Sequence, residues 1–215
     1  MNSEYFKIVL YPEKIEEKLK EAIVSFSKKE QKTIEKALTF ATKKHHAQQR
    51  DEGTPYISHC VLAALIAYEN KGNADDIVTL LLHDTIEDTE TSYDEIAELF
   101  GTEVADNVRA LSHTEGGARM SVEDYQKRLL ARPACLFHKS CDRIANLYST
   151  YVQPKRSKKQ RMIKGTEEFF YPMLEEKYPK MVQHMKDIIV YIKAHAIITK
   201  PFKARIKELQ NLSIS

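Results

Sequence analysis

The chain has 215 residues, enough to bury a hydrophobic core without disulfides or structural zinc. Its composition, 42% hydrophobic and 30% charged, excludes a disordered tail, a collagen and a membrane protein, since no stretch approaches the roughly 18 apolar residues of a spanning helix. Residues 151–215 hold 14 Lys and Arg against 6 Asp and Glu and carry +8, whereas the first 150 residues carry −6. This asymmetry suits a metal site that meets a polyanionic substrate, or equally a solvated pair of basic helices.

Six glycines and seven prolines are about half the usual share, so tight turns are scarce and a mostly helical protein is expected. Neither GxGxxG nor GxxxxGK[ST] occurs, which excludes both common glycine-rich phosphate loops. The N-terminus carries Glu4 and Lys7 and lacks the apolar run of a secretory signal. Cys60, Cys135 and Cys141 have no paired spacing, which predicts reduced thiols in a cytoplasmic protein.

Apolar residues recur at three- and four-residue spacing along most of the chain, which predicts a succession of helices joined by short polar segments. In the first of them Ile15, Leu19 and Ile23 share one face. We find no internal repeat, heptad run or low-complexity linker, so the prediction is one compact all-α bundle of about ten helices. The predicted helices cover residues 12–26, 30–46, 58–70, 75–88, 93–99, 102–111, 121–131, 134–150, 156–176, 179–197 and 201–212.

The helix predicted at residues 75–88 ends in four ionisable side chains, His83, Asp84, Glu87 and Asp88. Glu87 lies one turn beyond His83, and Asp88 lies one turn beyond Asp84, so all four line adjacent faces of the same helix end. Three carboxylates this close repel one another, and burying them unpaired costs several kcal/mol each. A divalent cation or a cluster of Arg and Lys would offset this cost. The alternative is an exposed acidic helix end.

Further metal ligands lie on both sides of this helix. His59 stands at the start of a predicted helix, and Asp142 lies in a helix whose apolar positions imply burial. Alternatively, Asp142 binds no metal and only forms an ion pair with the adjacent Arg143. Two histidines and two carboxylates would form a mixed nitrogen and oxygen site suited to Mn²⁺, Fe²⁺ or Zn²⁺. The candidate ligands outside the helix are His45, His46, His59, His113, His138 and Asp142.

Four ordered blocks of residues carry a family resemblance. They are His45-x-x-Gln48-x-Arg50-x-x-Gly53-x-Pro55-Tyr56-Ile57-x-His59, Leu81-Leu82-His83-Asp84-x-x-Glu87-Asp88-Thr89, Phe100-Gly101 and Lys139-x-x-Asp142-Arg143-x-x-Asn146-Leu147. The arrangement resembles the hydrolase domain of the RelA/SpoT family, within the HD superfamily of metal-dependent phosphohydrolases. It extends from about residue 31 to residue 176. No synthetase domain follows, so a stand-alone small alarmone hydrolase is expected.

The resemblance implies a role for each matching residue. In the family a metal ion, usually manganese, is held by the histidine after Pro-Tyr-Ile, by the His-Asp doublet and by the later aspartate. Glu87 and Asp88 are implied to be the catalytic pair that positions and deprotonates the attacking water. One divalent ion per chain is expected, with Zn²⁺ or Fe²⁺ as alternatives to Mn²⁺. The implied ligands are His59, His83, Asp84 and Asp142.

The resemblance also implies contacts with the substrate. Arg50 matches a residue that stacks on the guanine base, and Asn146 matches one that contacts the sugar region of the nucleotide. We add Ser149 and Lys159 as substrate-binding candidates. Lys159 belongs to a basic stretch at residues 155–164, which either holds the remaining phosphates of the substrate or is a lysine-rich surface segment.

Two further histidines are expected to support the site without reaching the substrate. His45 matches a family histidine near the cleft, and His138 lies one turn before Asp142. After Arg50 the family often has another basic residue, whereas Asp51 and Glu52 stand here.

The implied activity is metal-dependent hydrolysis of the 3′-diphosphate of guanosine alarmones, which converts (p)ppGpp to GDP or GTP and pyrophosphate. The alternatives are another HD phosphohydrolase, such as an NADPH phosphatase, an adenosine alarmone hydrolase or a 5′-nucleotidase, and an antitoxin-like partner of an alarmone synthetase. The expected partner is a small nucleotide substrate, ppGpp or pppGpp. We expect no nucleic-acid partner and no membrane partner. The sequence leaves open whether the chain forms a homo-oligomer. We expect a helical extension at residues 1–30, the HD-type hydrolase domain at 31–178, and C-terminal helices at 179–215 that pack on the same domain.

Overall fold

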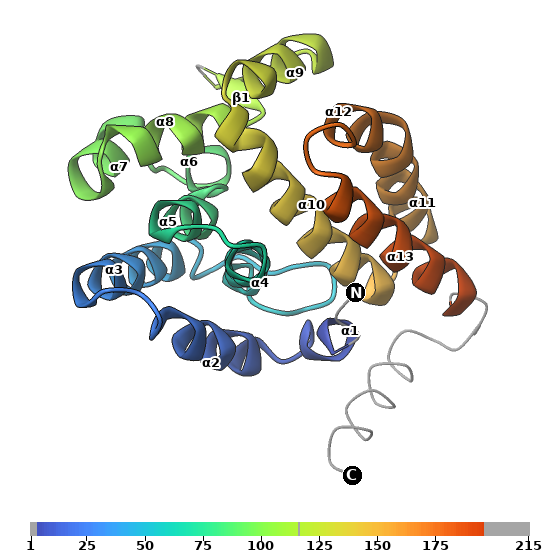
Figure 1. The fold of residues 1–215 in the computed structure, drawn as a ribbon, viewed down its shortest axis with the longest axis horizontal. Coiled ribbons are helices and arrows are strands. Elements are labelled where there is room, and N and C mark those ends of the chain that lie inside the picture. The colour runs from blue at the N-terminus through green and yellow to red at the C-terminus, as the bar shows by residue number, and fades with distance from the viewer. Residues whose placement is uncertain (1–3, 116, 196–215) are drawn as a thin grey trace.

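The computed structural model describes residues 4–115 and 117–195, and this part of the chain is an all-α bundle, as the sequence predicts (Figure 1). Its only strands there are β1 (Thr114–Glu115) and β2 (Ala118–Arg119), which form a small antiparallel ladder. The helix predicted at 201–212 lies outside the described residues. The helices are α1 (Tyr5–Ile8), α2 (Pro12–Ile23), α3 (Lys28–Lys44), α4 (Ile57–Glu69), α5 (Ala74–Leu82), α6 (Thr85–Asp88), α7 (Tyr93–Phe100), α8 (Thr102–Leu111), α9 (Val122–Ala131), α10 (Pro133–Val152), α11 (Arg156–Gly165), the π-helix η1 (Thr166–Phe170), α12 (Tyr171–Leu174) and α13 (Pro179–His195).

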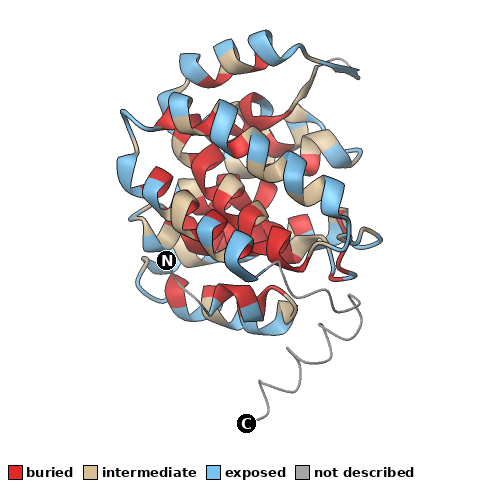
Figure 2. Cartoon of the chain, turned by 90° about the vertical axis from the view of Figure 1, so that its right-hand side faces the viewer, coloured by how far each residue is buried: buried red, intermediate tan, exposed pale blue. Residues whose placement is uncertain are grey.

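Helix α10 runs obliquely through the middle of the molecule, and other helices pack on two sides of it (Figure 1). Helices α4, α5 and α8 contact it on one side, and α11 and α13 contact it on the other. Residues 58–67 of α4 are all buried, as expected for an apolar helix that is surrounded by protein. Figure 2 shows buried residues concentrated in the interior of the bundle and exposed residues on the outer faces of its helices. No helix in the described ranges is long and apolar enough to cross a membrane.

Side-chain caps define where the helices near the site begin. Asn73 accepts a hydrogen bond from the backbone N–H of Asp76, and the Asp76 carboxylate accepts one from the backbone N–H of Asn73. This reciprocal pair satisfies two N–H groups that the helix itself leaves unbonded, an effect worth about 1 kcal/mol. The cap sets the start of α5, and therefore which residue stands at its other end, where His83 follows Leu82.

The single helix predicted at residues 75–88 was wrong, because the chain divides there into α5 and α6. His83 and Asp84 lie between the two helices, and Asp84 has φ −96° and ψ −3°, outside regular helix geometry. The Thr85 hydroxyl donates to the carbonyl of Leu82 at 2.7 Å, so a side chain competes with the backbone for this acceptor. The break places the His-Asp doublet at a corner of the fold rather than on a continuous helix face.

Both ends of the described chain pack against α10. The sequence predicted a first helix only from residue 12, but α1 precedes it, and its Phe6 is 2% exposed. The Phe6 ring stacks on Tyr191 of α13 with centroids 4.1 Å apart and meets Tyr148 of α10 edge-on at 4.9 Å. Aromatic contacts of this kind add about 0.5–1.5 kcal/mol beyond the area they bury. The division at residues 30 and 178 stays a prediction.

His184 makes the stability of this end of the bundle sensitive to pH. The Tyr148 hydroxyl on α10 lies 2.8 Å from Nε2 of His184 on α13, within hydrogen-bonding distance, and burial lowers the pKa of His184 to about 4. A histidine whose pKa is lower in the folded state stabilises the fold above its unfolded pKa, and this contribution is lost as the pH falls. We expect the free energy of unfolding to decrease between about pH 6.5 and pH 4, and His184→Gln to flatten that decrease in urea titrations at several pH values. His46→Gln, at an exposed histidine, is the control, and an unchanged pH dependence in His184→Gln would contradict this assignment.

Candidate active site

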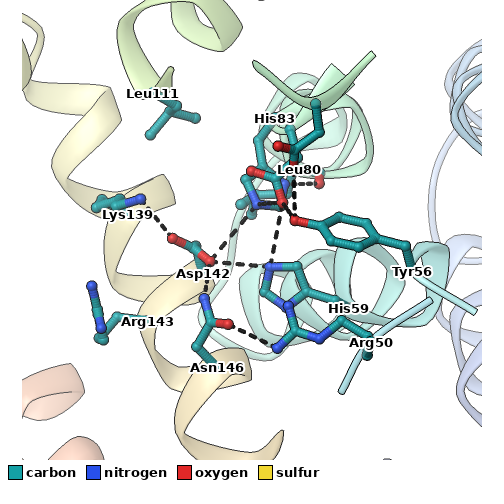
Figure 3. Close-up of polar contacts among 12 residues, drawn as sticks. Arg50, Tyr56, His59, Leu80, His83, Leu111, Lys139, Asp142, Arg143 and Asn146 are labelled. Atoms are coloured by element: carbon teal, nitrogen blue, oxygen red, sulfur yellow. Dashed lines mark hydrogen bonds and ion pairs between the residues drawn. The ribbon is translucent and has the colours of Figure 1, made fainter. Parts of the chain in front are cut away.

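Four side chains from separate parts of the chain meet beside α10, namely His59 of α4, His83 and Asp84 of the α5–α6 corner, and Asp142 of α10 (Figure 3). Nε2 of His59 lies 3.1 Å from Oδ1 of Asp142 and 3.7 Å from Oδ2 of Asp84. Nε2 of His83 lies 3.0 Å from Oδ2 of Asp84 and 3.7 Å from Oδ1 of Asp142. The residues that the sequence suggested as ligands are therefore neighbours in the fold.

The spacing of these atoms fits a shared divalent cation. Neighbouring ligand atoms that each lie about 2.0–2.2 Å from one ion are about 2.8–3.6 Å apart in octahedral or tetrahedral geometry. The Nδ1–H of His83 donates to the carbonyl of Leu80 at 2.7 Å, which leaves the lone pair on Nε2, the arrangement typical of a metal-bound histidine. That Nε2 is buried and makes no hydrogen bond. His59, His83 and Asp84 thus form a candidate metal site, with Asp142 in contact with both histidines.

Lys139 compensates part of the negative charge. Its Nζ lies 2.8 Å from Oδ2 of Asp142, one helical turn away on α10. Burial alone would raise the pKa of Asp142, but the positive charge of Lys139 holds that pKa well below its usual range. Burial and the charge of Arg50 lower the pKa of His59 to about 4, so this imidazole is neutral at pH 7 and able to ligate. The sequence analysis missed the role of Lys139, although its three-residue spacing from Asp142 places both on one helix face.

Glu87 and Asp88 follow the His-Asp doublet on α6 and are each held by a neighbour. Oε2 of Glu87 accepts a hydrogen bond from the backbone N–H of His113 at 2.7 Å. Oδ2 of Asp88 accepts from the Tyr56 hydroxyl at 2.8 Å, and the same hydroxyl lies 2.9 Å from Oδ2 of Asp84. Burial, and to a smaller extent the charge of Asp84, raises the pKa of both Glu87 and Asp88. This direction suits carboxylates that accept a proton near neutral pH.

Tyr56 joins the candidate metal site to Asp88, a role that the sequence analysis did not assign to it. Its ring stacks on His45 with centroids 4.9 Å apart and an interplanar angle of 22°. Nδ1 of His45 lies 2.8 Å from Oε1 of Gln48, whose amide donates to the backbone carbonyl of Asp88 at 2.6 Å. His45 thus contacts the site through Tyr56 and Gln48. The position of Tyr56 three residues before His59 was the available signal, because it allows both side chains to face the same neighbour.

A cleft of about 610 Å³ lies next to this cluster, within the size range of small-ligand sites. Arg50, Asn146 and Ser149 line it. Nη2 of Arg50 donates to Oδ1 of Asn146 at 3.0 Å, and the Asn146 amide donates to Oδ1 of Asp142 at 2.6 Å, so a chain of contacts leads from the cleft to the metal site (Figure 3). The guanidinium of Arg50 also lies 5.7 Å from the centre of the Tyr56 ring.

Two predicted site residues lie elsewhere. Lys159 is not among the residues that line the cleft, and its Nζ donates to the carbonyl of Tyr151 at 2.9 Å. Lys158 and Arg161 line the cleft instead, since residues three apart share one face of α11, whereas Lys159, adjacent to Lys158, lies on another face. His138 is completely buried, and its Nε2 lies 2.7 Å from Oδ1 of Asp76 in the first turn of α5. His138 therefore joins two helices away from the metal site.

Residues 37–176 match the HD domain family, a span that contains the four clustered side chains and the Glu87–Asp88 pair. The chain belongs to the HD domain family. Hydrolases of this family depend on metal ions, in keeping with the histidine and aspartate cluster that the HD domain carries here.

The chain is also similar to individual members of the HD domain family, including one of solved structure. The chain is 35% identical over 158 residues to a guanosine-3′,5′-bis(diphosphate) 3′-pyrophosphohydrolase of Aquifex aeolicus, covering 71% of this chain and 23% of that protein. It is 30% identical over 166 residues to the bifunctional (p)ppGpp synthase/hydrolase SpoT of Escherichia coli, covering 73% and 24%. The chain thus spans less than a quarter of the length of these curated relatives. A solved structure described as a metazoan ortholog of SpoT that hydrolyzes ppGpp shares the fold, with a TM-score of 0.63 at 19% identity, covering 74% of this chain and 94% of that one.

We predict that the HD domain binds about one divalent ion per chain and that Asp84→Ala abolishes this binding. Removing one of two carboxylates takes away a ligand and leaves the remaining donors too few to hold the ion. Elemental analysis of the purified protein measures the metal content. Asp94→Ala, at an exposed aspartate on α7, is the control that should retain the ion. A full metal content in Asp84→Ala would remove Asp84 from the ligand set.

Proposed function

We propose that the chain hydrolyses the 3′-diphosphate of (p)ppGpp and releases pyrophosphate together with GDP or GTP. The observation that carries this proposal is the cluster of two histidines and two carboxylates beside a nucleotide-sized cleft, with Glu87 and Asp88 adjacent. The activities of the Aquifex aeolicus and Escherichia coli relatives support the choice of substrate. Product identity follows from the chemistry, because release of pyrophosphate requires water to attack the phosphorus bonded to the ribose 3′-oxygen, and that oxygen then leaves with the nucleoside.

We propose His59, His83, Asp84 and Asp142 as the ligands of one divalent ion, with manganese as the first choice and Zn²⁺ or Fe²⁺ as alternatives. When bound, such an ion supplies Lewis acidity, which lowers the pKa of a coordinated water and polarises a phosphoryl oxygen. Lys139 holds one oxygen of Asp142, so that the other oxygen faces the histidines.

Glu87 and Asp88 are proposed as the groups that orient the attacking water and accept its proton. Their raised pKa values make them better proton acceptors than solvated carboxylates, and their location on α6 keeps them next to the ligands. The Tyr56 hydroxyl, between Asp84 and Asp88, fixes the distance between a ligand and a base. The position of the proposed ligand Asp84 and that of the proposed proton acceptor Asp88 therefore depend on the same hydroxyl group.

The substrate contacts are proposed as Arg50 for the purine base, Asn146 for the sugar region and Ser149 beside it. Lys158 and Arg161 replace Lys159 as the basic residues of α11 that face the cleft. All three cysteines are buried and free, in keeping with a reducing compartment, and we propose a cytoplasmic location for this nucleotide-binding enzyme.

The activity is tested with purified protein and Mn²⁺ on a panel of ppGpp, pppGpp, the adenosine alarmone, NADPH and a 5′-nucleotide, with chromatography of the products. Pyrophosphate from (p)ppGpp supports the proposal. Orthophosphate from NADPH or from the 5′-nucleotide, with no turnover of alarmones, contradicts it and assigns another phosphohydrolase activity. No turnover of any substrate, combined with stable binding to an alarmone synthetase, contradicts it in favour of the antitoxin-like role.

Glu87→Gln and Asp88→Asn are predicted to retain the metal ion and to lose turnover. Each change removes a proton acceptor while preserving the size of the side chain, and loss of a general base typically reduces kcat by about 10²–10⁴-fold. Metal content and kcat are measured on the same preparations, with Glu90→Gln, at an exposed acid after α6, as the control. Near-normal kcat in both variants at saturating Mn²⁺ would show that neither carboxylate accepts the proton.

Arg50→Ala is predicted to raise KM by roughly 2- to 30-fold with a small change in kcat. Stacking of a guanidinium on an aromatic base is worth about 0.5–2 kcal/mol, and 1.4 kcal/mol corresponds to about tenfold in affinity. The competing role is structural, since Nε of Arg50 lies 3.6 Å from Oε1 of Glu52. Measuring KM and the melting temperature on one variant separates the two. An unchanged KM with a lowered melting temperature would remove Arg50 from the base-binding site.

A further inference from the structure

Arg143 lines the cleft but has no anionic partner in the part of the chain that the structure describes. Its Nη1 contacts Sδ of Met162, a weak acceptor without charge, and its Nε is buried and makes no hydrogen bond. Figure 3 shows Arg143 next to Asp142 on α10, without a polar contact to the other residues drawn. Nη2 is therefore the guanidinium nitrogen left to meet a ligand in the cleft.

The neighbouring carboxylate of Asp142 forms no ion pair with Arg143 among the described contacts. Oδ2 of Asp142 lies 2.8 Å from Nζ of Lys139, and Oδ1 accepts from Asn146 and lies 3.1 Å from Nε2 of His59. The ion pair between Asp142 and Arg143 that the sequence left open is absent from the described contacts. Adjacent residues point about 100° apart on a helix, whereas Lys139, three residues earlier, shares the face of Asp142.

Other elements hold the Arg143 guanidinium in place. It stacks on Phe170, with its central carbon 3.8 Å from the ring centre, and Phe170 is only 4% exposed. Phe170 ends the π-helix η1, a rare local structure that occurs frequently at functional sites. The helix predicted at residues 156–176 contains this π turn, which the sequence pattern did not reveal. The cation–π contact orients the guanidinium before any ligand arrives.

Two other basic residues that line the cleft, Arg50 and Lys158, have acidic partners, unlike Arg143. Nε of Arg50 lies 3.6 Å from Glu52, and Lys158 forms an ion pair with Asp51. A partly buried cation without a counter-charge is unfavourable unless a ligand supplies one. Arginine in such a position suits phosphate oxygens, which accept its charge-assisted hydrogen bonds.

We infer that Arg143 binds a phosphate group of the ligand that enters this cleft. The identity of that ligand as a nucleotide diphosphate rests on the proposed function, but the phosphate contact itself does not. Arg143 is then a substrate-binding residue in the wall of the cleft, outside the metal site, and it favours phosphorylated ligands.

Binding of inorganic pyrophosphate tests the inference without any chemical step. Calorimetric titration in buffer with EDTA prevents the anion from carrying a metal ion into the site. Arg143→Met, which keeps an unbranched apolar stem against Phe170, is expected to weaken pyrophosphate binding by about 10- to 100-fold, the range for loss of one hydrogen bond between charged groups. Arg109→Met is the matched control, because Arg109 also stacks on an aromatic ring, at 4.5 Å from Tyr93, but pairs with Asp106 outside the cleft. Unchanged pyrophosphate affinity in folded Arg143→Met would overturn the inference.

Thermal melting separates ligand binding from a purely structural role. Pyrophosphate should raise the melting temperature of the unaltered protein and of Arg109→Met more than that of Arg143→Met. Equal ligand-induced shifts in all three proteins would overturn the inference. If Arg143→Met does not fold, Arg143→Lys and Arg143→Gln decide the question, since only the lysine variant keeps the charge. Pyrophosphate affinity at least about fivefold higher in Arg143→Lys supports the inference, and equal affinity overturns it.

Hydrolysis assays then show which of the two proposals fails. Normal KM and kcat for ppGpp in Arg143→Met would overturn the role of Arg143 and leave the proposed activity intact. Absence of alarmone hydrolysis in the unaltered protein, with pyrophosphate binding that still depends on Arg143, would overturn the proposed activity and support the phosphate contact.

Discussion

Two aspartates, Asp84 and Asp142, share the interior of this bundle with two histidines, and the rest of the site is arranged around their mutual repulsion. Carboxylates in such a position are stable only when positive charge or hydrogen-bond donors surround them. Lys139 provides one such charge at 2.8 Å, and the two imidazoles provide nitrogen atoms at 3.0–3.7 Å. The apolar surfaces of α4, α5 and α10 supply the burial energy that holds these polar groups together. A divalent ion bound between these groups would complete the balance of charge.

The contacts around this cluster link ligand binding to catalysis. Arg50, Asn146 and Asp142 form one chain of hydrogen bonds, and Tyr56 connects Asp84 to Asp88. Groups joined in this way do not contribute independently, so substitutions within the network are expected to be non-additive. A substitution of Arg50 can therefore affect the geometry around Asp142, and a substitution of Asp84 can affect the position of Asp88.

The charge of the cleft reflects contributions that partly cancel. The basic segment after residue 150 supplies Lys158 and Arg161, whereas Asp51 stands where the RelA/SpoT pattern often has a basic residue. Asp51 pairs with Lys158, so the segment contributes less free positive charge to the cleft than its composition implies. Arg143, which lies on α10, keeps its charge available because the helix face of Asp142 is already occupied by Lys139.

Local patterns in the sequence determined the helical class, most helix positions, and the residue types that suit a metal site, because helix periodicity and ligand chemistry are properties of short segments. His59, His83, Asp84 and Asp142 could be selected as a set only through the resemblance to the RelA/SpoT hydrolase domain, because spacing alone left other histidines open as ligands. Other features could not be predicted from short segments. They are the corner between α5 and α6, the burial of Phe6 in α1, the contacts of Tyr56 with Asp84 and Asp88, the place of Lys158 instead of Lys159 in the cleft, and the lack of an ion pair at Arg143 among the described residues. These features depend on which face of one helix meets which neighbour, and only the packing of distant segments decides that.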